Sequence, residues 1–113
     1  RALDVTCTKL RQVVENTGVG LILVSHLKRP EGRGHEEGAQ TSLSQLRGSH
    51  AIAQLSDLVI GAERNQQGDL AERSEMQIRV LKNRFSGQTG AVDKLLYDQQ
   101  TGRLVVPMSQ YFS

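Results

Sequence analysis

The sequence predicts an α/β fold in which central parallel strands are followed by an antiparallel meander. Two observations support this fold class. An apolar helical stripe leads into a continuous, β-branched apolar run at 19–24, which is typical of a strand buried on both faces of a parallel sheet. After residue 74, alternating segments are separated by glycine-containing turns, and this pattern favours antiparallel hairpins.

The first segment is expected to form a helix. Leu3, Cys7, Leu10 and Val14 recur at steps of four, three and four, so they lie on one helix face. Gly18 is suited to end this helix in a left-handed turn. The stripe predicts that Cys7, the single cysteine, is a core residue, and one cysteine fits a reducing compartment.

The middle of the chain combines irregular and regular segments. Proline and glycines disfavour regular structure over 25–41. A short helical stretch is expected at 43–55, with an interruption at Gly48. A second apolar strand is expected at 58–62, and the polar segment 64–73 is expected to be a loop without core residues.

The last part of the domain is expected to be a meander. Its strands are predicted at about 75–85, 92–98 and 103–106. They are joined by turns at 86–90 and 98–102, each with a glycine at or near its end. This arrangement gives the second half of the chain its antiparallel character.

Composition indicates one small globular domain. The 113 residues are 23% charged and only 4% aromatic, without tryptophan. We expect one domain portion over 1–108, a tail at 109–113, and an origin inside a larger protein because the chain opens without methionine. A net charge of +2 and a pI near 9.0 permit an anionic partner. No apolar run is long enough to predict a membrane span.

The most informative feature is a cation pair at a strand end. Met76, Ile78 and Val80 alternate with polar residues, and Lys82 and Arg84 follow at the same spacing before a glycine turn. The two cations should therefore lean to one face and be held by the sheet. In phosphoryl transfer such a cation can be an arginine finger. The alternative is a pair of solvated charges at a hairpin end.

A basic loop and a histidine follow the first predicted strand. His26 stands where a buried strand would end, so it could sense a phosphate, or serve only as a structural hydrogen-bonding group. Lys28, Arg29 and Arg33 crowd one short segment. Such a loop can grip a nucleic-acid backbone through charge, and the alternative is a solvated basic loop.

Several kinds of site are excluded by spacing. His35-Glu36-Glu37 resembles the start of a zinc-protease motif, but position 39 is Ala39 instead of the second histidine. The three histidines and one cysteine show no metal-ligand spacing, so no metal site is predicted. No G-x-x-x-x-G-K-[ST] phosphate loop occurs, and no strand ends in a carboxylate suited to Mg²⁺. The chain alone is therefore not expected to hydrolyse a nucleotide.

Short motifs along the chain nevertheless occur in a familiar order. Together they closely resemble the C-terminal part of the RecA-like hexameric helicase domain in the primase-helicases of short-tailed phages, and more distantly Twinkle and the DnaB-type replicative helicases. The resemblance covers nearly the whole chain. Its motifs are Ser25-His26-Leu27-Lys28, His35-Glu36-Glu37-Gly38, Leu46-Arg47-Gly48-Ser49, Gln54-Leu55-Ser56-Asp57, the segment 63–69 and the segment 81–90.

The resemblance implies roles for residues near the phosphates. It implies the C-terminal half of a RecA-like P-loop NTPase core, working as an NTP-dependent DNA helicase. His26 corresponds to a sensor of the γ-phosphate, and Gln54 to a residue that couples hydrolysis to DNA. Lys82 and Arg84 correspond to a pair that reaches the nucleotide of the neighbouring subunit, with Arg84 as the finger. Ala53 departs from the phage pattern, which has an arginine there.

The resemblance also implies ligands and partners. Arg64 and Tyr97 correspond to the side chains that sandwich the nucleotide base, and a guanidinium and a phenol ring suit such stacking. The nucleotide would be ATP or dTTP with Mg²⁺, whose ligands lie outside this chain. The implied partners are single-stranded DNA, identical subunits in a hexameric ring and other replication proteins. The DNA-binding residues would be Lys28, Arg29, Arg33, Arg47 and Gly48.

The expected location is the cytoplasm of a phage-infected or prophage-bearing bacterium, in preference to a mitochondrion. Two alternative functions stay open at this point. One is a RecA-like recombinase or another ring ATPase, and the other is a non-catalytic module that binds single-stranded nucleic acid. A phosphate loop within the hundred or so residues before Arg1 would separate the two enzymes from the binding module.

Overall fold

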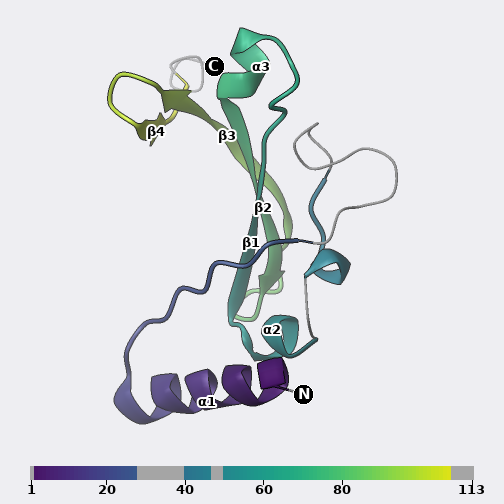
Figure 1. Ribbon diagram of the computed structural model, residues 1–113, viewed down its shortest axis with the longest axis vertical. Coiled ribbons are helices and arrows are strands. Elements are labelled where there is room, and N and C mark those ends of the chain that lie inside the picture. Colours follow the sequence, from purple (N-terminus) through teal and green to yellow (C-terminus); the bar gives the residue numbers. More distant parts are fainter. Residues whose placement is uncertain (1, 28–39, 47–49, 108–113) are drawn as a thin grey trace.

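The computed structural model describes residues 2–27, 40–46 and 50–107. Its centre is a four-stranded sheet in the order β1-β2-β3-β4, and all three strand pairs are antiparallel (Figure 1). The strands are β1 (Leu58–Glu63), β2 (Glu75–Asn83), β3 (Gly90–Asp98) and β4 (Arg103–Val105). The predicted meander is confirmed, because consecutive strands are neighbours throughout the sheet.

The first helix, α1 (Ala2–Thr17), is the predicted amphipathic helix. Cys7 is buried, as its place in the apolar stripe predicts. Gly18 follows with a φ of 74°, and its N–H donates to the carbonyl oxygen of Val14 at 2.9 Å. This bond closes the last turn in the left-handed conformation that glycine adopts without strain. The helix packs against α2 (His50–Leu55), which contributes the buried Ile52.

The prediction of a buried strand at 19–24 is wrong. This segment forms no ladder and lies exposed between α1 and the sheet; Ile22 is 92% and Val24 is 87% exposed. A strand requires hydrogen bonds to a neighbouring strand. The described part of the chain supplies none here, and it contains no parallel strand pair. Segment 19–24 is apolar, as expected, but the described residues contain no parallel core.

Two further expectations need correction. The segment 64–73 is not wholly a loop, because it contains most of the short helix α3 (Leu70–Ser74). The side chain of Asp69 caps this helix by accepting from the N–H of Glu72 at 2.9 Å, a local D-x-x-E signal that was missed. The stretch expected to be helical at 43–55 forms a 3-10 turn, η1 (Leu43–Gln45), and then α2. Gly48, where an interruption was expected, lies outside the described residues.

The two predicted hairpin turns are confirmed. The N–H of Gly102 donates to the carbonyl oxygen of Asp98 at 2.7 Å between β3 and β4. The N–H of Gly87 donates to the carbonyl oxygen of Asn83 at 2.8 Å, with a φ of 74° at the glycine. The turn at Gly87 follows the end of β2 and therefore contains Arg84, two residues after Lys82.

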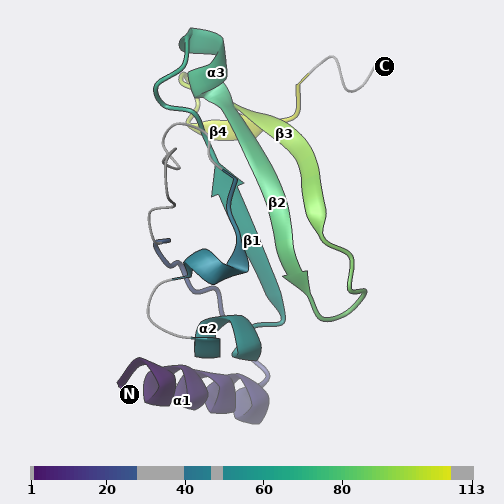
Figure 2. The ribbon, with the colours of Figure 1, turned by 90° about the vertical axis from the view of Figure 1, so that its right-hand side faces the viewer.

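The sheet is long, and different helices lie at its two ends. Figure 2 shows α1 and α2 beside the lower end of β1 and β2, with α3 and β4 at the opposite end. No helix among the described residues has the length and apolar character needed to cross a membrane.

Candidate functional site

Lys82, Arg84 and the main chain of Gln54 meet where β2 ends beside α2. The ammonium group of Lys82 donates to the carbonyl oxygens of Ala53 and Gln54 at 2.6 and 3.1 Å. The guanidinium of Arg84 donates to the same carbonyl of Gln54 at 2.9 Å. Lys82 on β2 and Arg84, which directly follows that strand, therefore both bind the last turn of α2, where helix carbonyls lack partners and favour positive charge.

Asp57 completes this cluster, which we call the finger cluster (Gln54, Asp57, Lys82, Arg84 and Arg11). One carboxylate oxygen of Asp57 accepts from Arg84 at 2.7 Å, and the other accepts from Arg11 of α1 at 2.8 Å. The hydrogen bond from Arg11, followed by the charges of Arg11, Arg84 and Lys82, holds the pKa of Asp57 below its usual value. Asp57 is therefore ionised at neutral pH.

The turn after β2 fixes the main chain around Arg84. The side-chain oxygen of Asn83 accepts from the N–H groups of Phe85 and Ser86 at 3.1 and 3.3 Å. The side-chain amide of Asn83 donates to the hydroxyl of Ser86 at 2.7 Å. Because asparagine readily binds its own following backbone, the sequence Asn-Arg-Phe-Ser-Gly folds locally into this turn.

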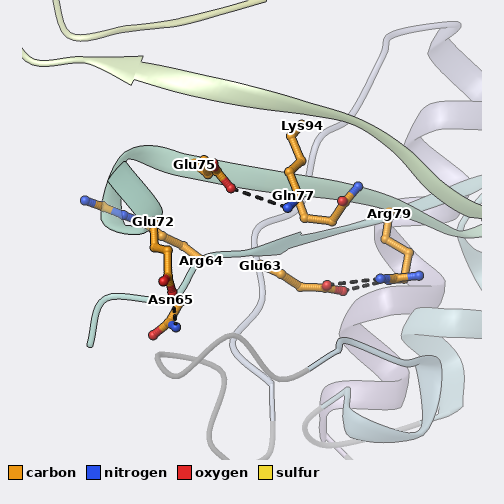
Figure 3. A pocket seen from close by; sticks show the side chains of 8 residues that line it. All are labelled: Glu63, Arg64, Asn65, Glu72, Glu75, Gln77, Arg79 and Lys94. Atoms are coloured by element: carbon orange, nitrogen blue, oxygen red, sulfur yellow. Dashed lines mark hydrogen bonds and ion pairs between the residues drawn. The ribbon is translucent and has the colours of Figure 1, made fainter. Parts of the chain in front are cut away.

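A polar cavity of about 360 Å³ lies toward the other end of the sheet, as seen in Figure 3. Arg64 is one of its walls, and its Nε donates to the carbonyl oxygen of Arg73. Both acidic and basic side chains line the cavity, and among them Lys94 and Glu75 form an ion pair at 3.3 Å. The lining residues are Glu63, Arg64, Asn65, Glu72, Glu75, Gln77, Arg79 and Lys94.

Tyr97 lies on β3 at the same end of the sheet but does not line this cavity. Its Cα pairs with Leu104 of β4, and it directly follows Leu96, the partner of Glu75 on β2. Arg64 directly follows Glu63, which pairs with Gln77. The starting segment of β2 therefore stands between Arg64 and Tyr97, and no direct contact joins them in the described structure.

The sequence reasoning missed a buried cluster on β1 and β2. The carboxylate of Glu63, only 6% exposed, accepts from Arg79 at 2.8 and 3.2 Å and from the N–H and hydroxyl of Thr41 at 2.8 and 2.7 Å. Burial raises the pKa of Glu63, but the hydrogen bonds from Arg79 and Thr41 outweigh burial and leave that pKa below its usual value. The available signal was a carboxylate at the end of an apolar strand, which requires a cation once buried.

The remaining predicted residues are not gathered into either site. His26 is exposed at the end of the extended segment after α1, and its carbonyl oxygen accepts from the hydroxyl of Ser25 at 3.3 Å. The predicted DNA-binding residues lie outside the described residues: Lys28, Arg29, Arg33, Arg47 and Gly48. Among the residues that the structure does describe, no three His, Cys, Asp or Glu side chains come together as metal ligands.

Comparison with known proteins identifies the family. The DnaB-like helicase C-terminal domain matches residues 2–105. The chain is also 46% identical over 105 residues to a DNA helicase/primase of Enterobacteria phage T3, a match that covers 92% of this chain. The chain spans only 18% of that relative's length. The resemblance drawn from the ordered motifs is thereby confirmed, and the chain belongs to the DnaB-like helicase C-terminal domain family.

Proposed function

We propose that this chain is the C-terminal part of an NTP-driven replicative DNA helicase domain that works as a hexameric ring on single-stranded DNA. Its 46% identity to a phage DNA helicase/primase supports this proposal. Arg84, assisted by Lys82, would contact the nucleotide held mainly by the neighbouring subunit. Arg64 and Tyr97 would contact the base of the subunit's own nucleotide. ATP or dTTP with Mg²⁺ is the proposed substrate, and no residue of this chain is assigned to the metal.

The observation that carries the proposal is the separation of the two sets of residues. Arg64 and Tyr97 flank the start of β2, whereas the finger cluster lies at its end. A strand rises by about 3.3 Å per residue, so Glu75 and Asn83, the two ends of β2, are roughly 26 Å apart. At this distance, the two sets of residues are better placed to contact two different nucleotides than to contact the same one. This separation supports a ring that binds its nucleotides between subunits.

The chemistry of the finger cluster fits a trans-acting role. Lys82 and Arg84 are bound to neutral carbonyls and to one carboxylate that Arg11 shares, so positive charge is left over. Arg84 stays 42% exposed. An exposed guanidinium with a fixed backbone can approach an incoming phosphate without first escaping from a buried site, and it can offset the charge that develops on the γ-phosphate.

The roles of the other residues complete the proposal. His26 would sense the γ-phosphate, and Gln54, whose carbonyl receives both cations, would connect the finger to α2 and to bound DNA. Lys28, Arg29, Arg33, Arg47 and Gly48 would contact the DNA backbone in the ring's channel. Other replication proteins would be partners, and the site of action would be the cytoplasm of a phage-infected or prophage-bearing bacterium.

Arg84→Ala in the full-length protein tests the proposal. Loss of an arginine finger should reduce NTP hydrolysis by a factor on the order of 10³ or more, while nucleotide binding changes little. Mixing this variant with one that lacks a working phosphate loop should restore part of the activity. In the mixed ring, some sites would combine an intact phosphate loop from one subunit with an intact Arg84 from its neighbour. Near-normal turnover by Arg84→Ala would refute the assignment of the finger.

The same assays separate the alternatives. A recombinase or another ring ATPase would hydrolyse NTP in an Arg84-dependent manner without unwinding a forked duplex. A non-catalytic binding module would bind single-stranded DNA without any turnover, in the wild type as well as in the variant. The isolated 113-residue chain is expected to be inactive in every case, because its sequence contains no phosphate loop.

A further inference from the structure

Asp57 joins Arg84 to a helix that is distant in sequence. It stands between the end of α2 and the start of β1, and its two carboxylate oxygens bind two different arginines. Arg84 directly follows the end of β2, and Arg11 comes from the third turn of α1. A single carboxylate thus bridges the proposed finger and the helix that packs beneath it.

The contact with Arg84 is made twice, through the main chain and through the side chain. The N–H of Arg84 donates to the carbonyl oxygen of Asp57 at 2.9 Å, while its guanidinium donates to the carboxylate at 2.7 Å. The second guanidinium nitrogen donates to the carbonyl of Gln54 at 2.9 Å. These three bonds fix both ends of a long, rotatable side chain, which otherwise samples many rotamers.

The cluster is arranged to hold the guanidinium without enclosing it. The side chains of Arg84 and Asp57 keep 42% and 35% of their surface exposed. The carboxylate of Asp57 also binds Arg11. Its single negative charge is therefore divided between two guanidinium groups, and Arg84 keeps part of its positive charge.

We propose that Asp57 is a positioning residue for Arg84, and that Arg11, through the same carboxylate, ties the orientation of the finger to α1. This inference rests on the proposed function of Arg84 as the finger. Orientation matters because misplacement of a reacting group by about 1 Å can cost on the order of 100-fold in rate. Asp57 would thus affect the rate of hydrolysis without touching the nucleotide.

The test uses DNA-stimulated NTP hydrolysis by the full-length protein. Asp57→Ala should lower kcat by roughly 10- to 100-fold and leave KM for the nucleotide unchanged. Asp57→Asn should lose less, because its amide oxygen can still accept from Arg84. Arg11→Ala should lose less than Asp57→Ala, because both bonds between Asp57 and Arg84 remain. In the Arg84→Ala background, Asp57→Ala should cause no further loss.

Glu15→Gln is the matched control. Glu15 binds the other side of Arg11 at 3.0 Å but is 59% exposed, and the structure gives it no bond to Asp57 or Arg84. Its kcat should equal that of the wild type. If Asp57→Ala does not assemble, Asp57→Asn and Arg11→Ala carry the test, and wild-type kcat in both overturns the inference.

The outcomes distinguish this inference from the function it rests on. A wild-type or faster kcat for Asp57→Ala, beside an inactive Arg84→Ala, overturns the positioning role and leaves the finger intact. Losses that add when Asp57→Ala and Arg84→Ala are combined show that Asp57 acts independently of Arg84, and these also overturn it. A fully active Arg84→Ala refutes the finger itself.

Discussion

Arg79 and Glu63 form the most buried ion pair among the described residues, joining β2 to β1 by hydrogen bonds of 2.8 and 3.2 Å. Thr41 donates two more bonds to the same carboxylate, so Glu63 is fully satisfied although it is hardly exposed. Through Glu63 the segment before η1 is held against the end of β1, and the pair also lines the cavity that Arg64 lines.

Removal of one partner of this pair should be costly. Glu63→Ala leaves the guanidinium of Arg79 and the N–H of Thr41 without their acceptor, and we expect a loss of about 3 kcal/mol in the free energy of unfolding. Urea denaturation measures this loss. The control is Glu75→Gln, which breaks the exposed ion pair with Lys94 and should cost less than about 1 kcal/mol. Equal losses in the two variants would contradict the importance of the buried pair.

The same pair predicts how stability depends on pH. The pKa of Glu63 in the folded protein lies below its ordinary value of 4.5, so the unfolded chain binds a proton first. The stabilising contribution is complete above that ordinary value and is lost as the pH falls through the pKa of the folded state. Glu63→Gln should therefore show a shallower loss of stability on acidification below pH 4.5 than the wild type. An unchanged slope would show that other groups dominate acid unfolding.

Gly61 is required by the close approach of Thr41 to β1. A methyl group at Gly61 would lie 2.1 Å from the hydroxyl oxygen of Thr41 and 2.9 Å from its Cβ, so Gly61→Ala must displace Thr41 from Glu63. We expect a loss of about 1–3 kcal/mol in the free energy of unfolding. At Gly20 the same methyl group meets no atom within 4 Å, and Gly20→Ala should change stability by less than about 0.5 kcal/mol. A similar effect of both substitutions would mean that Thr41 moves away at little cost.

Local patterns predicted the elements, and pairing across the chain decided the sites. The stripe ending at Gly18, and the strand that carries Lys82, could be read because each depends on near neighbours in sequence. The carbonyl of Gln54 that both cations bind lies 28 and 30 residues away, and the bond between Arg11 and Asp57 spans 46 residues. Spacing along the sequence does not encode such contacts.

The expectation for 19–24 failed for a related reason. The sequence shows that these residues are apolar, but a strand is defined by a partner, which the segment itself cannot specify. The partnership of Glu63 and Arg79 likewise depends on register, because Arg79 pairs with Gly61 and reaches Glu63 diagonally along the sheet. Sequence patterns therefore predicted single elements better than they predicted which residues contact one another across the chain.

The basic segment 28–33 leads to a prediction about DNA binding. Replacing Lys28 and Arg29 with alanine in the full-length protein should weaken binding to single-stranded DNA and flatten its salt dependence by roughly one to two units of log–log slope. Hydrolysis without DNA should change little. Lys9→Ala with Arg103→Ala removes two exposed cations elsewhere and serves as the control. An unchanged slope after loss of Lys28 and Arg29 would assign those charges to the solvated surface.

The last prediction concerns the exposed apolar segment 19–24. Five of its side chains are at least half exposed, with Ile22 and Val24 almost bare. An accessible apolar run with free backbone groups can pair with another chain. We therefore expect the isolated 113-residue chain to self-associate at micromolar concentrations and to bind a hydrophobic dye, as measured by sedimentation and fluorescence.

Ile22→Ser with Val24→Ser should reduce both signals without lowering the free energy of unfolding, because neither side chain is packed. Ile52→Ser, at a buried position of α2, is the contrasting variant and should increase dye binding by loosening the contact with α1. A wild-type chain that stays monomeric and binds no dye would show that the segment finds a partner within the chain itself.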